Sequence, residues 1–96
     1  MLLDLSHKNL MEIPELPPDT KIFSCGYDQI TKIENLSPGL VYFVCWNNQI
    51  TKIENLPLGL IEFSCGSNQI TKIENLPLGL VAFYYRSNPI KYVDDV

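Results

Sequence analysis

The segment NQITKIENL recurs along this chain at a fixed interval. It occurs at residues 48–56 and 68–76, and a copy with Asp28 in place of the first asparagine spans 28–36. Successive copies begin 20 residues apart, with no insertion or deletion between them. A repeat this short cannot bury its own apolar face, so neighbouring units have to stack and share one core. The sequence therefore predicts a repeat solenoid.

The same period divides the whole chain into five repeats. We place them at 1–19, 20–39, 40–59, 60–79 and 80–96. Five columns are apolar or aromatic in every repeat: Leu3, Phe23, Phe43, Phe63 and Phe83; Leu5, Cys25, Cys45, Cys65 and Tyr85; Leu10, Ile30, Ile50, Ile70 and Ile90; Ile13, Ile33, Ile53, Ile73 and Val93; Leu16, Leu36, Leu56, Leu76 and Val96. We expect these columns to form one core. The odd number of cysteines argues against a disulfide framework and favours buried, reduced thiols.

The consensus of the repeats is L-x-x-F-x-C-x-x-N-x-I-x-x-I-x-x-L-P. It resembles the leucine-rich repeat signature L-x-x-L-x-L-x-x-N/C-x-L, which 40–50 and 60–70 follow in order, with Phe and Cys at two of the positions. The 20-residue length and the closing Leu-Pro pair are similar to the short repeats of secreted effectors of enteric bacteria and of repeat proteins of giant amoebal viruses. The resemblance covers essentially the whole chain. It implies a leucine-rich repeat horseshoe whose concave face holds a protein partner.

Each repeat is expected to contribute one short strand to a parallel sheet on the concave face. Phe43 and Cys45 alternate with period two, as in a strand with one buried face. Pro57 and Pro77 restrict the residues before them to extended backbone. We therefore expect an extended or 3₁₀ convex side and little or no α-helix. The asparagine column that includes Asn48 is expected to satisfy buried backbone groups and to connect neighbouring repeats.

Charge and composition argue against several kinds of partner. The net charge is −4 and the seven basic residues are spread along the chain, so nucleic acid and anionic membranes meet no positive surface. No apolar run is long enough to span a membrane. The first residues, MLLDLSHKNL, lack the basic start of a signal peptide. We expect a cytoplasmic protein, or one in the host-cell cytoplasm if it is an effector or viral protein.

Differences between the repeats fall at strand positions that are expected to face away from the core. Trp, Tyr and Arg are frequent anchors of protein interfaces, and exposed apolar patches commonly mark binding sites. We predict a partner-binding surface formed by Tyr27, Tyr42, Val44, Trp46, Glu62, Tyr84 and Arg86. The alternative is that Trp46 and Tyr84 only cover their smaller neighbours, Gly66 and Ser64.

The sequence contains no arrangement of side chains typical of an enzyme. His7 is the only histidine, and we expect it to be an exposed side chain on the first strand. Cys25, Cys45 and Cys65 would stack in a row that could bind a soft metal, but the apolar columns around them favour packing. We predict no catalytic residues, no metal site and no cofactor.

Two functional hypotheses follow. The first is a protein-binding module that uses the concave face of the solenoid. The second is a repeat segment of a larger multidomain protein, because some effectors with such repeats add a helical cap and a ubiquitin-ligase domain that has no match here. The terminal repeats show no evident polar cap, so we also expect weak self-association through the uncapped ends.

Overall fold

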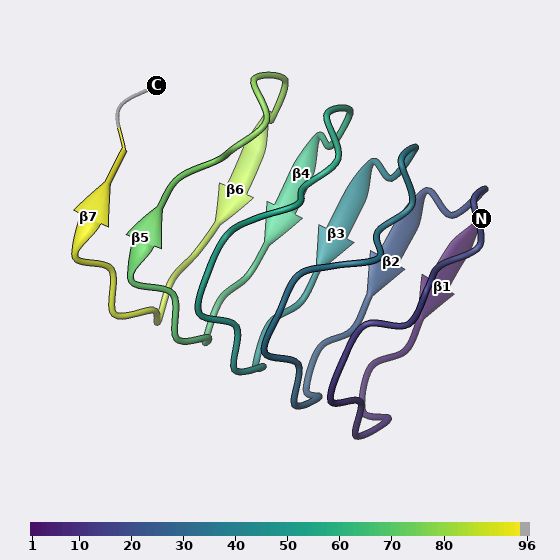
Figure 1. Ribbon diagram of the computed structural model, residues 1–96, viewed down its shortest axis with the longest axis horizontal. Coiled ribbons are helices and arrows are strands. Elements are labelled where there is room, and N and C mark those ends of the chain that lie inside the picture. The colour runs from purple at the N-terminus through teal and green to yellow at the C-terminus, as the bar shows by residue number, and fades with distance from the viewer. Residues whose placement is uncertain (95–96) are drawn as a thin grey trace.

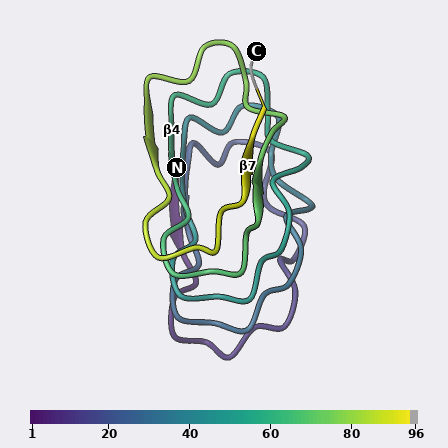
Figure 2. The ribbon, with the colours of Figure 1, turned by 90° about the vertical axis from the view of Figure 1, so that its left-hand side faces the viewer.

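The computed structural model describes residues 1–94, and its successive turns lie side by side along the longest axis of the molecule (Figure 1). Viewed along the stack, the turns nearly superimpose and surround a common interior (Figure 2). The molecule measures 33 × 28 × 17 Å. Asp95 and Val96 lie outside the described residues, and so does the place predicted for Val96 in the column that begins with Leu16.

A five-stranded parallel sheet forms one side of the stack, in the order β1-β2-β3-β4-β6. The strands are β1 (Leu2–Asp4), β2 (Ile22–Ser24), β3 (Tyr42–Val44), β4 (Glu62–Ser64) and β6 (Ala82–Tyr84). Each residue is paired with the residue 20 positions later, as Phe23 is with Phe43. One parallel strand for each 20-residue period is thereby confirmed.

The opposite, convex side of the stack is extended backbone apart from left-handed residues such as Asn55. β5 (Lys72–Ile73) and β7 (Tyr92–Val93) pair there in a second parallel sheet, which the sequence did not indicate. No α-helix or 3₁₀ segment occurs within residues 1–94, so of the two predicted convex conformations the extended one is observed. The reason is that backbone groups of the arc bond to the neighbouring repeat, as Gln49 N does to Ile30 O at 2.8 Å, and not within their own turn.

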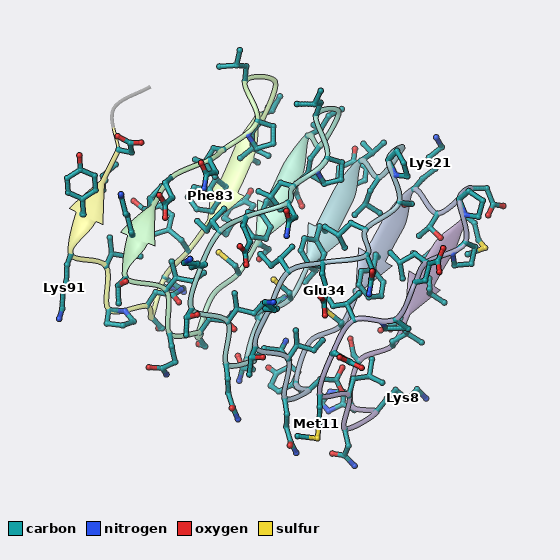
Figure 3. The ribbon with its side chains drawn as sticks, viewed as in Figure 1. Lys8, Met11, Lys21, Glu34, Phe83 and Lys91 are labelled. Atoms are coloured by element: carbon teal, nitrogen blue, oxygen red, sulfur yellow. The ribbon has the colours of Figure 1, made fainter. Side chains whose placement is uncertain are left out.

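The phenylalanine column forms the centre of the core. Phe23, Phe43 and Phe63 are fully buried, and their rings stack with centroids 5.8 and 5.4 Å apart. Phe83 continues the stack at 5.6 Å but is only partly buried, because the described residues place no further repeat over it (Figure 3). The register of the sheet thus sets the register of the core, layer by layer.

The cysteine column lies beside the phenylalanines. Cys25, Cys45 and Cys65 are free and fully buried, which confirms their predicted place in the core. Burial raises the pKa of Cys25 and of Cys65 to about 12, and the charges of Asp28 and Asp4 add to the effect at Cys25. Burial, with the neighbouring thiols second, raises the pKa of Cys45 well above its ordinary value. All three cysteines are therefore uncharged thiols near neutral pH.

The three thiols are expected to react slowly in the native protein. A free thiol ionises with a pKa of about 8.5, so raising the pH from 7 to 9 strongly accelerates labelling of the unfolded chain. The same change leaves Cys25 and Cys65 protonated in the native state, because the pH stays well below about 12. Mass-spectrometric counting of alkylated cysteines in native buffer and in denaturant measures both rates. Rapid native labelling of any of the three would place that cysteine outside the core.

A ladder of asparagine side chains joins the repeats at the end of the concave sheet. Asn68 Oδ1 accepts a hydrogen bond from Ile50 N at 3.0 Å, and its Nδ2 donates to the carbonyl oxygens of Cys45, Cys65 and Gly66 at 3.0–3.2 Å. Asn48 and Asn88 repeat this arrangement one turn away on either side. Each of these amides therefore satisfies backbone groups of its own repeat and of the preceding one, as predicted for this column.

A second asparagine column stabilises the convex arc. Asn35, Asn55 and Asn75 all have left-handed backbone, with φ of 58–59°. Asparagine tolerates this conformation better than other residues with a side chain. Each donates from Nδ2 to a carbonyl oxygen of the preceding repeat, as Asn35 does to Ile13 O at 2.8 Å. These bonds give a physical reason for the constancy of the second asparagine in NQITKIENL.

Asp28 interrupts the first asparagine ladder. Its Oδ1 accepts hydrogen bonds from Lys8 N at 2.8 Å and from Leu10 N at 3.1 Å. Its Oδ2 is buried without a hydrogen-bond partner in the described part of the chain. In the next repeat Asn48 Nδ2 stands at this position and donates to three carbonyl oxygens. Asp28 has no amide donor, so its side chain forms fewer hydrogen bonds than that of Asn48.

Candidate functional site

The concave face is formed by the side chains that point outward from the strands and from the residues just after them. Tyr42 and Val44 lie on β3, Glu62 on β4 and Tyr84 on β6. Trp46 follows β3, and Tyr27 and Arg86 occupy the corresponding stretches after β2 and β6. Among the aromatic side chains, Tyr84 is 56% exposed, Tyr27 50%, Trp46 48% and Tyr42 39%. These side chains therefore offer a large aromatic area to solvent.

A hollow of about 470 Å³ lies on this face at the third, fourth and fifth repeats. It is lined by Val44, Trp46, Glu62, Ser64, Gly66, Ser67, Tyr84 and Arg86. The structure thus brings together Val44, Trp46, Glu62, Tyr84 and Arg86 from the predicted surface. Tyr27 and Tyr42 do not line the hollow.

The floor residues of the hollow were not among the predicted site residues. Ser64, Gly66 and Ser67 carry small side chains or none, whereas the sequence prediction rested on large residues that often anchor interfaces. The sequence signal that indicates these residues is a difference in side-chain size within one column of the repeats. Ser64 stands between Val44 and Tyr84 in the paired register of β3, β4 and β6. A small residue between two large ones leaves a gap.

Gly66 creates the same kind of gap in the next outward column, which runs Ser6, Gly26, Trp46, Gly66, Arg86. A Cβ atom at Gly66 would lie 3.3 Å from the Arg86 carbonyl oxygen and 3.8 Å from Arg86 Cγ. The Arg86 stem therefore lies against Gly66. A Cβ atom at Gly26 would lie 3.8 Å from Trp46 Cδ1, so the indole contacts the Gly26 side. Trp46 is therefore close to Gly26 and remains half-exposed.

The hollow holds two opposite charges at separate places on its rim. Glu62 is half-buried and Arg86 is exposed. Within residues 1–94 neither forms an ion pair, whereas Lys72 Nζ and Glu74 Oε1 pair at 3.4 Å on the convex side. Both charges of the hollow are therefore available to a bound molecule.

Tyr27 belongs to a separate aromatic pair at the first two repeats. Its ring stacks on His7 with centroids 4.6 Å apart and planes 8° from parallel. Both residues have left-handed backbone, at φ of 58° and 59°. His7 is exposed as predicted, but it lies in the turn after β1 and not on the strand, because β1 ends at Asp4. The pair extends the aromatic area of the concave face toward the first repeat.

The most exposed apolar side chains lie at a different edge of the molecule. Leu58 is 90% exposed, Leu78 91% and Val81 81%, all in or near the turns that precede β4 and β6. Charged side chains such as Lys8, Lys21 and Lys91 point outward from the stack (Figure 3). This apolar edge was not predicted to bind a partner. It is the main competitor of the concave face as an interaction surface.

The in-register parallel strands, the layered core and the asparagine ladder define a leucine-rich repeat solenoid. No family model matches the chain, and no curated protein does. Among solved structures the chain is similar to YopM from Yersinia enterocolitica WA-314, with a TM-score of 0.73 and 22% sequence identity over 91% of this chain. The chain spans 24% of the YopM chain that it matches. At this identity the likeness shows the fold.

Residues 1–94 also bear on metal binding and on insertion into a membrane. No group of three or more His, Cys, Asp or Glu side chains in this part of the chain could hold a metal ion. None of the described segments forms a helix long and apolar enough to cross a membrane.

Proposed function

We propose that this chain is a protein-binding module whose concave face, centred on Trp46, holds a protein partner. The main support for the proposal is the set of positions at which two otherwise identical repeats differ. Repeats 40–59 and 60–79 share every residue except those at five positions, which are Val41/Ile61, Tyr42/Glu62, Val44/Ser64, Trp46/Gly66 and Asn47/Ser67. The last four pairs lie at outward positions of the concave face, and members of each line or border the hollow. Duplication alone would not place four of the five differences on one face.

The chemistry of these positions supports binding. Trp, Tyr and Arg supply large contact areas and dominate interface hot spots. The five strands span only about 20 Å across the sheet, given a spacing of ~4.8 Å between neighbours. Such a face supports a small to standard interface of at most roughly 800 Å² per partner. Affinity would then depend on one or two anchors, of which Trp46 is the largest.

Replacing Trp46 by alanine is expected to weaken binding by about 2 kcal/mol or more while leaving folding nearly unchanged. The reason is that the indole is 48% exposed and does not contribute to the buried core. Peptides selected on the immobilised protein from a displayed library of random peptides are titrated against the parent and the variant, and both proteins are unfolded in urea.

Tyr92→Ala is the matched control, because Tyr92 is 54% exposed on the convex strand β7, away from the hollow. It should bind the selected peptides as the parent does. If Trp46→Ala also binds like the parent, or if it unfolds the protein, Trp46 is not a binding anchor.

We also propose several further properties of this chain. The leucine-rich repeat fold is typically a scaffold, so we propose binding and no catalysis for residues 1–96 acting as one domain. The hypothesis of a repeat segment of a larger protein is supported by the match to only 24% of the YopM chain. A cytoplasmic location is supported by the three free, buried thiols. Self-association is supported by the part-exposed Phe83 and by Tyr85, which is 44% exposed.

A further inference from the structure

We propose that the hollow between Trp46 and Arg86 receives one aromatic side chain of the protein partner. This inference rests on the proposed function and specifies what the concave face recognises. The side chain enters over Ser64, contacts the indole of Trp46 on one side and lies beside Arg86, whose stem lies against Gly66, on the other. Flanking residues of the partner lie along the neighbouring strand positions.

The small floor residues indicate that the space is built for an occupant. The φ angle at position 66 does not require glycine, because no glycine in the described residues has positive φ. A Cβ atom there would make one close contact, at 3.3 Å from the Arg86 carbonyl oxygen. The equivalent positions of the neighbouring repeats carry Trp46 and Arg86, so this site of the repeat accepts large side chains. The position of Ser64 also accepts large side chains, because its partners on the neighbouring strands are Val44 and Tyr84. Two successive outward positions of one repeat are therefore small where both neighbouring repeats are large.

The spacing of the repeats admits one planar ring between Trp46 and Arg86. The backbones of these two residues belong to the third and fifth repeats and lie two strand spacings, about 10 Å, apart. A ring that contacts a planar group on each face at 3.5–4.0 Å needs roughly 7–8 Å between those groups. The volume of about 470 Å³ leaves room for the ring and for the adjoining part of a peptide.

The chemistry of the walls favours an uncharged aromatic ring over other side chains. Indole and guanidinium groups both stack on aromatic faces, and Val44 adds an apolar wall. A Lys or Arg side chain would be attracted by Trp46 and Glu62 but repelled by Arg86. An Asp or Glu side chain would be attracted by Arg86 but repelled by the carboxylate of Glu62. An aliphatic side chain would be buried but would gain no stacking.

Filling the floor of the hollow tests this inference. Ser64→Leu places a larger side chain where Val44 and Tyr84 show that the strand tolerates one, and it leaves the core columns unchanged. Ser24→Leu is the control, since Ser24 is the same residue in the same column of β2 and does not line the hollow. It also loses the hydrogen bond between Ser24 Oγ and Ser6 Oγ at 3.0 Å, and urea unfolding measures the effect of that loss on stability. The probe is the set of peptides selected on the parent protein from the displayed random library. Urea unfolding of each variant verifies that it is folded.

The selected peptides are expected to share an aromatic residue at one fixed position. Its replacement by alanine should weaken binding at least about tenfold, as should Ser64→Leu, whereas Ser24→Leu should change affinity less than about twofold. Peptides that require Trp46 but lack a fixed aromatic residue, carry a fixed Arg or Lys instead, or bind Ser64→Leu unchanged would overturn this inference and leave the proposed function standing. A selection in which no peptide depends on Trp46 would contradict both.

Discussion

Replacing Phe43 by alanine is expected to lower the free energy of unfolding by about 3–5 kcal/mol. The ring is fully buried and stacks between Phe23 and Phe63 at 5.8 and 5.4 Å. The cavity cannot collapse easily, because the neighbouring layers are fixed by the register of β2, β3 and β4. A domain of this size has about 5–15 kcal/mol of stability in total, so the variant should be close to unfolding.

Urea unfolding followed by far-UV circular dichroism measures this loss. Tyr42→Ala is the control, because Tyr42 is the adjacent residue of the same strand and points outward, 39% exposed. It should change the free energy of unfolding by less than about 1 kcal/mol. Equal losses in the two variants would mean that the inward and outward faces of β3 are wrongly assigned.

Replacing Asn68 by aspartate is expected to lower the free energy of unfolding at pH 7 by about 3 kcal/mol or more. The change is nearly isosteric, so it opens no cavity. It removes the Nδ2 donor from the carbonyl oxygens of Cys45, Cys65 and Gly66 and places a buried carboxylate against them. Burial raises the pKa of such a carboxyl above its unfolded value of about 3.9, so the loss should be smaller at pH 4, where the protonated group can donate.

Two further variants isolate the hydrogen bonds of the ladder. Asn47→Asp makes the same chemical change at an exposed residue and should have little effect. Asp28→Asn makes the reverse change and should raise the free energy of unfolding by about 1 kcal/mol, because the buried Oδ2 that lacks a partner becomes a donor. Urea titrations of the three variants at pH 7 and pH 4 measure these differences. If Asn68→Asp is no more harmful than Asn47→Asp, the ladder does not stabilise the fold.

Much of the fold follows from the period of the sequence. An uninterrupted spacing of 20 residues places Phe23 beside Phe43, and the alternation of Phe43 and Cys45 sets which face is buried. These features depend on the pattern alone, because every repeat has to bury the same columns against its neighbours. The asparagine ladder was predictable for the same reason, since strands that end at the same level leave the same backbone groups unpaired.

The second sheet could not be predicted, because its sequence is not distinctive. Thr-Lys-Ile occurs identically at 31–33, 51–53 and 71–73, yet only the last copy contributes a strand, β5, which pairs with Tyr92–Val93. The difference therefore comes from the neighbouring repeat and not from the segment itself.

The hollow was predictable only in part. The sequence placed Val44, Trp46, Glu62, Tyr84 and Arg86 on one face, and that much follows from strand alternation. It did not show that the Trp46 indole contacts the Gly26 side and that the Arg86 stem lies against Gly66, because both depend on side-chain rotamers. Nor did it show that Tyr27 lies outside the hollow, near the first repeat, where its ring stacks on that of His7.

Mapping a bound peptide by NMR tests most directly whether the concave face is the binding surface. The backbone amides and the Trp46 indole N–H are assigned, and a selected peptide is titrated into the labelled protein. The largest shift changes are expected at Trp46, Gly66 and Ser67 and at the neighbouring residues of β3, β4 and β6. Changes confined to the apolar edge of Leu58, Leu78 and Val81, or to the convex arc, would contradict the proposal that the concave face holds the partner.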